Sequence, residues 1–154
     1  SKERVLPIGL GARDTLRTEM KYSLYGHELS EQISPLEAGL ERFIDWNKDF
    51  IGKTALQKEK AVGVKRSMVA FTSTSRRSPR GDFKIFSEAG QDIGIVTSGT
   101  FSPALERGIG LGLVETGFLA KDQKIYLGPG GEFKNALEAV ITPRTFYKKG
   151  TLRQ

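Results

Sequence analysis

Short strand-like runs of apolar residues, separated by turn signals, fill the chain after a change of pattern near residues 61–66. Glycine, proline and serine mark the turns, for example in 75–81, 88–90, 98–102 and 128–131. The six predicted strands are 68–72, 83–86, 93–97, 109–114, 124–127 and 136–141. Six short strands at nearly regular spacing, with few helices between them, indicate a small barrel or sandwich.

The chain before residue 61 has a mixed pattern. Apolar residues recur at four-residue steps from Leu16 to Leu24, which predicts a helix over 12–25 that the following glycine ends. A proline followed by interrupted apolar positions predicts a strand over 35–46. A short helix with a basic, exposed face is predicted over 52–60. The sequence therefore predicts a mixed α and β segment ahead of the strand-rich part.

Composition narrows the classes of function. The chain has 154 residues, no cysteine and a single histidine, His27. This excludes thiol nucleophiles, disulfides and multi-histidine metal sites, and argues against a Ser-His-Asp triad. No stretch approaches the roughly 20 apolar residues of a membrane span, and no signal-peptide pattern follows the first residues. The formal charge of +6 indicates a polyanion, an acidic protein or a polycarboxylate as partner, or simply a solvated basic surface.

The segment Gly-Leu-Gly-Ala-Arg-Asp-Thr-Leu-Arg, residues 9–17, is the first with chemical content. Glycines before a helix allow close approach of the backbone, and free N–H groups there can receive an anion. Arg13 and Arg17 lie four apart on one helical face, which makes a fork for carboxylates plausible. The alternative is that the two arginines pair with Asp14, Glu19 or other neighbours.

Four blocks of sequence occur in the order found in one protein family. They read GLGARDTLR…LYG, SPLEAGLE, NKDFIGKTAL and GIVTSGTFSPALERGIGLGLV, with ALEAVITPRTFY near the end. On these blocks the chain resembles, over essentially its whole length, the C-terminal portion of the aminomethyltransferases, the T proteins of the glycine cleavage system. Members of that family are a little over twice this length, so the chain is expected to be a C-terminal piece of one.

The resemblance implies an activity that depends on tetrahydrofolate. In this family the aminomethyl group carried on the lipoyl arm of lipoylated H protein is the substrate. The one-carbon unit passes to tetrahydrofolate, and ammonia is released. The family's catalytic aspartate and its pterin-holding acid belong to the N-terminal half, and no aspartate here matches either. We therefore name no catalytic residue, expect this chain alone to be inactive, and expect a bacterial cytoplasm or a mitochondrial matrix as its location.

The resemblance also implies three folate-binding residues. Arg13 matches a folate-contacting arginine, Tyr22 matches an aromatic residue of the same site, and Arg153 is the nearest match to a basic residue near the C-terminus. On an ideal helix Tyr22 would lie about 180° from Arg13, so both reach one ligand only if the helix ends or bends. Otherwise Tyr22 is a half-buried aromatic and Arg153 part of a mobile basic terminus. Where relatives commonly read Arg-Leu-Glu-Ala-Gly, residues 17–21 read Arg-Thr-Glu-Met-Lys.

Other functions stay open from the sequence. The chain also resembles the folate module of dimethylglycine- or sarcosine-oxidising flavoproteins, and less closely a folate-binding factor for iron–sulfur assembly whose hallmark cysteine is absent. A non-catalytic barrel that binds nucleic acid would use stacked aromatics, which here are also candidates for the core: Phe71, Phe83, Phe86 and Tyr126. The basic loop 76–81 is either a solvated hairpin end or part of a docking face for H protein.

These observations together predict an α+β chain. Residues 1–60 are expected to be the trailing part of a folate-binding domain, and residues 61–154 a small C-terminal six-stranded antiparallel β-barrel. The predicted helix 12–25 and strand 35–46 would normally pack on elements of the family's N-terminal half. We therefore expect an exposed apolar face there, with self-association or poor order as the consequence. Neither a metal nor a membrane partner is expected.

Overall fold

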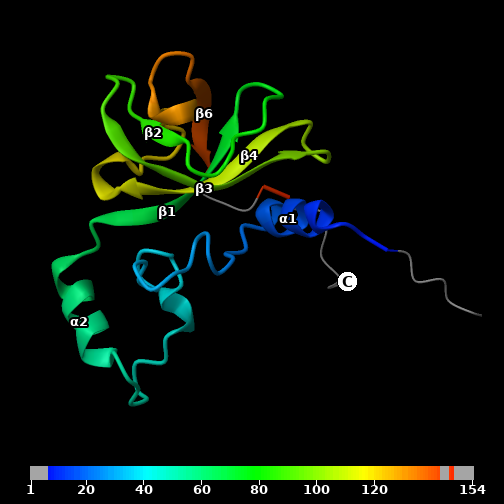
Figure 1. Cartoon of the computed structure of the whole chain (residues 1–154). Coiled ribbons are helices and arrows are strands. Elements are labelled where there is room, and N and C mark those ends of the chain that lie inside the picture. Colours follow the sequence, from blue (N-terminus) through cyan, green and yellow to red (C-terminus); the bar gives the residue numbers. More distant parts are fainter. Residues whose placement is uncertain (1–6, 143–145, 148–154) are drawn as a thin grey trace, which may run out of the picture.

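The computed structural model describes residues 7–142 and 146–147. Two helices and a short helical turn precede six strands (Figure 1). The elements are α1 (Leu10–Glu19), η1 (Glu41–Phe43), α2 (Lys53–Val62), β1 (Arg66–Ser73), β2 (Lys84–Phe86), β3 (Asp92–Ser102), β4 (Arg107–Glu115), η2 (Thr116–Phe118), β5 (Lys124–Gly128), η3 (Pro129–Gly131) and β6 (Leu137–Thr142). None of the helices in these described ranges is long and apolar enough to cross a membrane.

The six strands form one closed antiparallel barrel in the order β1-β4-β3-β2-β5-β6, with β6 pairing back onto β1. The predicted α+β class and six-stranded barrel are confirmed. The turn predicted over 98–102 is wrong, because this segment continues β3 and pairs with β4 from Leu111 to Arg107. A register shift between Val96 and Ser98 lets the long strand bend around the barrel.

The interior of the barrel is filled by alternating side chains. Every second residue of β6 is buried, as a strand with one face on a core requires. The largest interior side chains are Phe71, Ile85, Ile93, Ile125 and Leu127. Since Phe71 and Phe86 are both buried, they offer no stacking surface to nucleic-acid bases.

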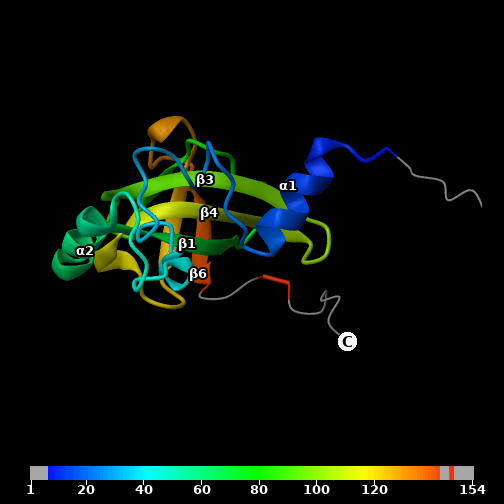
Figure 2. The same ribbon diagram turned by 90° about the horizontal axis from the view of Figure 1, so that it is seen from below.

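Strands β1 and β4 are buried on their outer face as well. Met68, Ala70, Leu111 and Leu113 form a second apolar cluster there, against which Ile33 packs. Figure 2 shows the segment between α1 and α2 lying along this side of the barrel. The near-continuous burial of β4 follows from this cover, because neither of its faces is left to solvent.

The predicted helix over 12–25 is observed as α1, which is shorter. It ends at Glu19 and Met20, and Lys21 then takes a left-handed backbone conformation with φ of 58°. Burial in α1 is concentrated in its last turn and does not follow the apolar pattern. Leu10 and Leu16 are 84% and 63% exposed, whereas the polar residues from Arg17 to Glu19 are buried. An exposed apolar face was expected in this segment, and α1 has one.

The strand predicted over 35–46 is wrong. The backbone here satisfies its own hydrogen bonds in turns: Ala38 donates to Ser34 at 3.0 Å, and Leu40 donates to Pro35 at 2.9 Å. Gly39, with φ of 69°, supplies the left-handed residue that such a turn requires. Because these groups are paired locally, the segment has no need of a partner strand. The helix predicted over 52–60 is confirmed as α2.

Close backbone approach inside the barrel gives a test of its packing. A Cβ added at Gly110 would lie 2.5 Å from the ring of Phe71 and 2.7 Å from the carbonyl oxygen of Ser98. Gly110→Ala is expected to lower the free energy of unfolding by about 1–3 kcal/mol, the usual cost of overpacking. Gly117→Ala is the control, because a Cβ there meets nothing within 4 Å. Urea denaturation measures both, and equal midpoints for the two variants would contradict the packing described.

Candidate functional site

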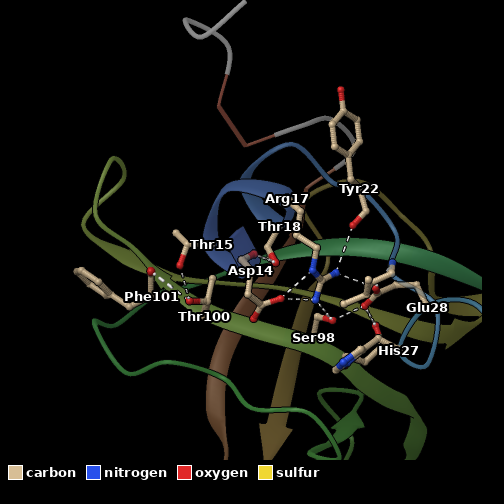
Figure 3. A network of polar contacts seen from close by, with 12 residues as sticks. Asp14, Thr15, Arg17, Thr18, Tyr22, His27, Glu28, Ser98, Thr100 and Phe101 are labelled. Atoms are coloured by element: carbon tan, nitrogen blue, oxygen red, sulfur yellow. Dashed lines mark hydrogen bonds and ion pairs between the residues drawn. The ribbon is translucent and has the colours of Figure 1, made fainter. Parts of the chain in front are cut away.

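A buried polar network joins α1 to the barrel, and Arg17 stands at its centre (Figure 3). Its guanidinium donates from Nε to Asp14 Oδ1 at 2.7 Å, from Nη1 to Glu28 Oε2 at 2.9 Å, and from Nη2 to Ser98 Oγ at 2.9 Å. Nη1 also donates to the carbonyl oxygen of Tyr22 at 3.2 Å. One side chain thus ties together α1, the loop that follows it, and β3.

Glu28 is the fully buried anion of this network and has no exposed surface. Besides Arg17, its carboxylate accepts from the backbone N–H of Leu24 at 3.0 Å, from Thr97 Oγ1 at 2.6 Å and from the hydroxyl of Ser98. A buried charge is tolerated when it is paired and its remaining lone pairs are satisfied. This carboxylate meets both conditions.

Alternate residues of β3 provide the barrel's side of the contact. Ser98, Thr100 and Ser102 point to one face of the strand, since strand side chains alternate. Thr100 bonds to Thr15 at 3.2 Å, and Ser102 donates to the carboxylate of Glu19 at 2.5 Å. Helix α1 is therefore held along its buried side by hydroxyls of a single strand, and its orientation on the barrel is fixed.

The structure places the predicted site residues as follows. Arg13 is exposed on α1, and no hydrogen bond or ion pair joins it to another described residue. Tyr22 is 62% exposed, and its ring points away from the network (Figure 3). The helix has ended before Tyr22, which is the condition under which Arg13 and Tyr22 can serve one ligand. Arg153 lies outside the described residues.

Arg13 and Arg17 do not form the carboxylate fork that their spacing made plausible. Arg17 is buried and its donors are used within the chain. Pairing of Arg17 with Asp14, the alternative prediction, is confirmed, whereas Glu19 binds Ser102 instead.

Sequence reasoning missed Glu28 and assigned the Ser98 segment to a turn. Glu28 follows the isolated histidine, whose Nδ1 lies 3.1 Å from the carbonyl oxygen of Thr97. Nothing local marks this glutamate as buried, because the side chains that bind it lie 11 and 69–70 residues away in the chain. The one available signal was a cluster of hydroxyl residues in 97–102, which turns also favour. Among the described residues no group of three acidic, histidine or cysteine side chains is placed to hold a metal.

Comparison with known proteins gives two matching family models. The model of the glycine cleavage T-protein C-terminal barrel domain matches residues 66–148, and the model of the GCVT N-terminal domain matches residues 1–48. The first match covers the whole barrel, from the first residue of β1 to beyond β6.

Curated relatives named aminomethyltransferase match nearly the whole chain. The one from Flavobacterium psychrophilum is 46% identical over 145 residues, which are 94% of this chain and 39% of the relative. One from Listeria monocytogenes serotype 4b is 47% identical over 149 residues, 96% of this chain and 40% of the relative. The crystal structure of glycine cleavage system aminomethyltransferase T from Bartonella henselae aligns with a TM-score of 0.83 at 25% identity, covering 91% of this chain and 39% of that one. The chain thus spans about two fifths of the length of these relatives.

The buried ion pair gives a test of what holds α1 in place. Glu28→Gln keeps the shape of the side chain but leaves Arg17 without its buried counter-charge. We expect the free energy of unfolding to fall by about 3 kcal/mol, the cost of breaking a buried pair. Glu41→Gln is the control, because Glu41 and Lys60 form a half-exposed pair worth less than about 1 kcal/mol. Chemical denaturation followed by circular dichroism measures both, and an equal loss in the two variants would contradict this role.

Proposed function

The chain belongs to the glycine cleavage T-protein family, and on this premise we propose that it serves the transfer of an aminomethyl group to tetrahydrofolate. The observation that carries the proposal is the match of the barrel-domain model to residues 66–148, together with 46–47% identity to curated aminomethyltransferases. In this proposal the group comes from the lipoyl arm of lipoylated H protein. Ammonia is the other product.

We assign the chain's two parts to different tasks within this function. Residues 1–60 are proposed as the folate-binding part, and residues 61–154 as the barrel that supports it. That this chain alone is inactive stays a prediction, as do its cytoplasmic or mitochondrial location and its self-association through the apolar side chains on α1. The flavoprotein folate module and the nucleic-acid barrel are not favoured, since the curated relatives cited above are named aminomethyltransferases.

Arg13 and Tyr22 are the described residues proposed to hold folate, and Arg153 is proposed as a third contact. Tetrahydrofolate, when bound, would accept the one-carbon unit. Its p-aminobenzoyl ring is flat and its glutamate part is anionic, which suits the donor set available here. An exposed guanidinium offers five N–H donors, and an exposed tyrosine ring offers a flat surface for contact. The network around Arg17 engages Tyr22 only through its backbone and Arg13 not at all, so the Arg13 guanidinium and the Tyr22 ring are available to a ligand.

The network around Arg17 has a positioning task in this proposal. It fixes the orientation of α1 and therefore the direction in which Arg13 leaves the helix. It also grips Tyr22 by its backbone, whose N–H donates to the carbonyl oxygen of Arg17 at 2.8 Å. A binding surface whose residues are held before the ligand arrives loses less conformational entropy on binding.

The folate assignment is tested by titrating tetrahydrofolate, or a stable folate analogue, into the chain by calorimetry. Arg13→Ala is expected to weaken binding by about tenfold or more, the usual effect of removing a charge-assisted hydrogen bond. Arg42→Ala is the control, since Arg42 is an exposed arginine on η1, away from α1. The assignment fails if the unaltered chain shows no binding, or if both variants bind alike.

The second partner, H protein, is proposed to contact the basic loop before β2. Arg77 and Arg80 are exposed there, whereas Arg76 lies over the ring of Phe101 at 5.4 Å and has a structural contact. These arginines would attract an acidic surface of the partner, over a distance that the ionic strength sets through screening.

This docking proposal predicts that the double variant Arg77→Ala, Arg80→Ala associates severalfold more slowly with lipoylated H protein at low salt. The difference should shrink as the salt concentration rises, because the charges are exposed. Stopped-flow or surface plasmon resonance measures the rate. The double variant Lys48→Ala, Lys58→Ala removes the same charge elsewhere and should change the rate less. If both double variants slowed association equally, the loss of net charge alone would explain the effect, and this loop would not be the contact.

A further inference from the structure

A pocket of about 190 Å³ opens between the end of α1 and the outside of the barrel. Its walls come from Lys21 just beyond α1, from β1 and β6, and from the loop that precedes β5. The lining is apolar at Met68, Val69, Leu119 and Ile141, and polar at Lys21, Ser67, Lys121 and Thr142. Its lining contains none of the residues proposed to hold folate.

The backbone at Lys21 is held in a conformation that a side chain disfavours. Its φ of 58° lies in the left-handed region, where glycine is the residue without a steric cost. The turn is enforced by its neighbours, since Lys21 N–H donates to Thr18 at 2.9 Å and the carbonyl oxygen of Glu19 accepts from Phe146 and Tyr147. A residue that its neighbours hold in a disfavoured backbone conformation, beside a pocket, points to a functional role.

The charge in this pocket is not balanced by its lining. Lys21 and Lys121 both contribute to the wall, and no aspartate or glutamate does. The acid near Lys121 is Asp122, whose carboxylate lies 3.6 Å from its amine, with both side chains 70% exposed. Burial lowers the pKa of the Lys21 amine below its ordinary value, because the charged form has lost water. A partly buried cation in such a place is stabilised by an anion.

We propose that this pocket binds a small oxyanion, a carboxylate or a phosphate, between Lys21 and Lys121. The two amines supply the positive charge, and the Ser67 hydroxyl supplies a neutral donor. The hydroxyl of Thr142 is shared with Thr72 at 3.1 Å and contributes less. The apolar wall suits the carbon chain of a small organic acid. This inference does not depend on the proposed folate site, because it uses different residues.

The test measures the midpoint of thermal unfolding in increasing inorganic phosphate, against sodium chloride at equal ionic strength. A ligand that binds only the folded state raises the midpoint in a saturable way. Lys21→Met keeps the apolar stem and removes the charge. Lys121→Met does the same at an exposed residue, so it leaves the fold intact if the first variant is damaged. Lys58→Met, on the exposed side of α2, is the matched control. A glutarate series beside the phosphate series separates the two anion classes.

The expected result is a saturable rise with phosphate or glutarate that chloride does not give. The apparent dissociation constant should increase by about tenfold in Lys21→Met and in Lys121→Met, as for the loss of one charge-assisted contact. It should stay unchanged in Lys58→Met. The proposal is overturned if neither anion exceeds chloride, or if the two pocket variants respond as the unaltered chain does. It is also overturned if Lys58→Met loses the effect equally, since the binding is then unspecific.

Discussion

The buried contact between Arg17 and Glu28 is the constraint on which the rest of this structure depends. Each charge would be strongly destabilising alone in the interior, so neither residue can move without the other. Glu28 receives donors from α1, from its own loop and from β3, and these fix all three segments at once. A helix held by the polar residues of its last turn leaves Leu10, Arg13 and Leu16 exposed, whatever its hydrophobic pattern would favour alone.

The barrel can serve as the other half of this contact because its apolar interior is built from other residues. The interior cluster around Phe71 contains no member of the Arg17 network. Strand β3 extends beyond its pairing with β2, and this extension from Ser98 onward carries the hydroxyls that meet α1. A long strand anchored on one side by β4 therefore offers a rigid row of donors. This explains why a segment rich in serine, threonine and glycine is strand here, although its composition is typical of turns.

Elements whose conformation depends on the local pattern of apolar and polar residues could be predicted from the sequence. Elements whose conformation depends on residues distant in the chain could not. The barrel strands could be predicted, because turn residues bound each short apolar run, and a period of two appears where one face meets solvent, as in β6. The segment 35–46 was wrongly predicted as a strand, because its apolar spacing does not show that its backbone groups pair with one another in turns. The orientation of α1 was not readable either, because it follows from Glu28, which only the folded loop brings to Arg17. Of the candidate site residues, Arg13 and Tyr22 have the exposure that a ligand contact requires, but exposure alone assigns no ligand.

Two basic residues close together in the chain show how the same physics separates a structural charge from a candidate binding group. Arg17 is buried with its donors met by Asp14, Glu28 and Ser98, so its charge is fully compensated inside the chain. Lys21 is partly desolvated in a left-handed turn, beside a pocket lined by a second lysine and by no carboxylate. Folding alone gives no reason to keep a cation in that environment, since a glycine would relieve the backbone and an apolar side chain would fill the space. The unmet electrostatic requirement, rather than the positive charge itself, distinguishes Lys21 from Arg17.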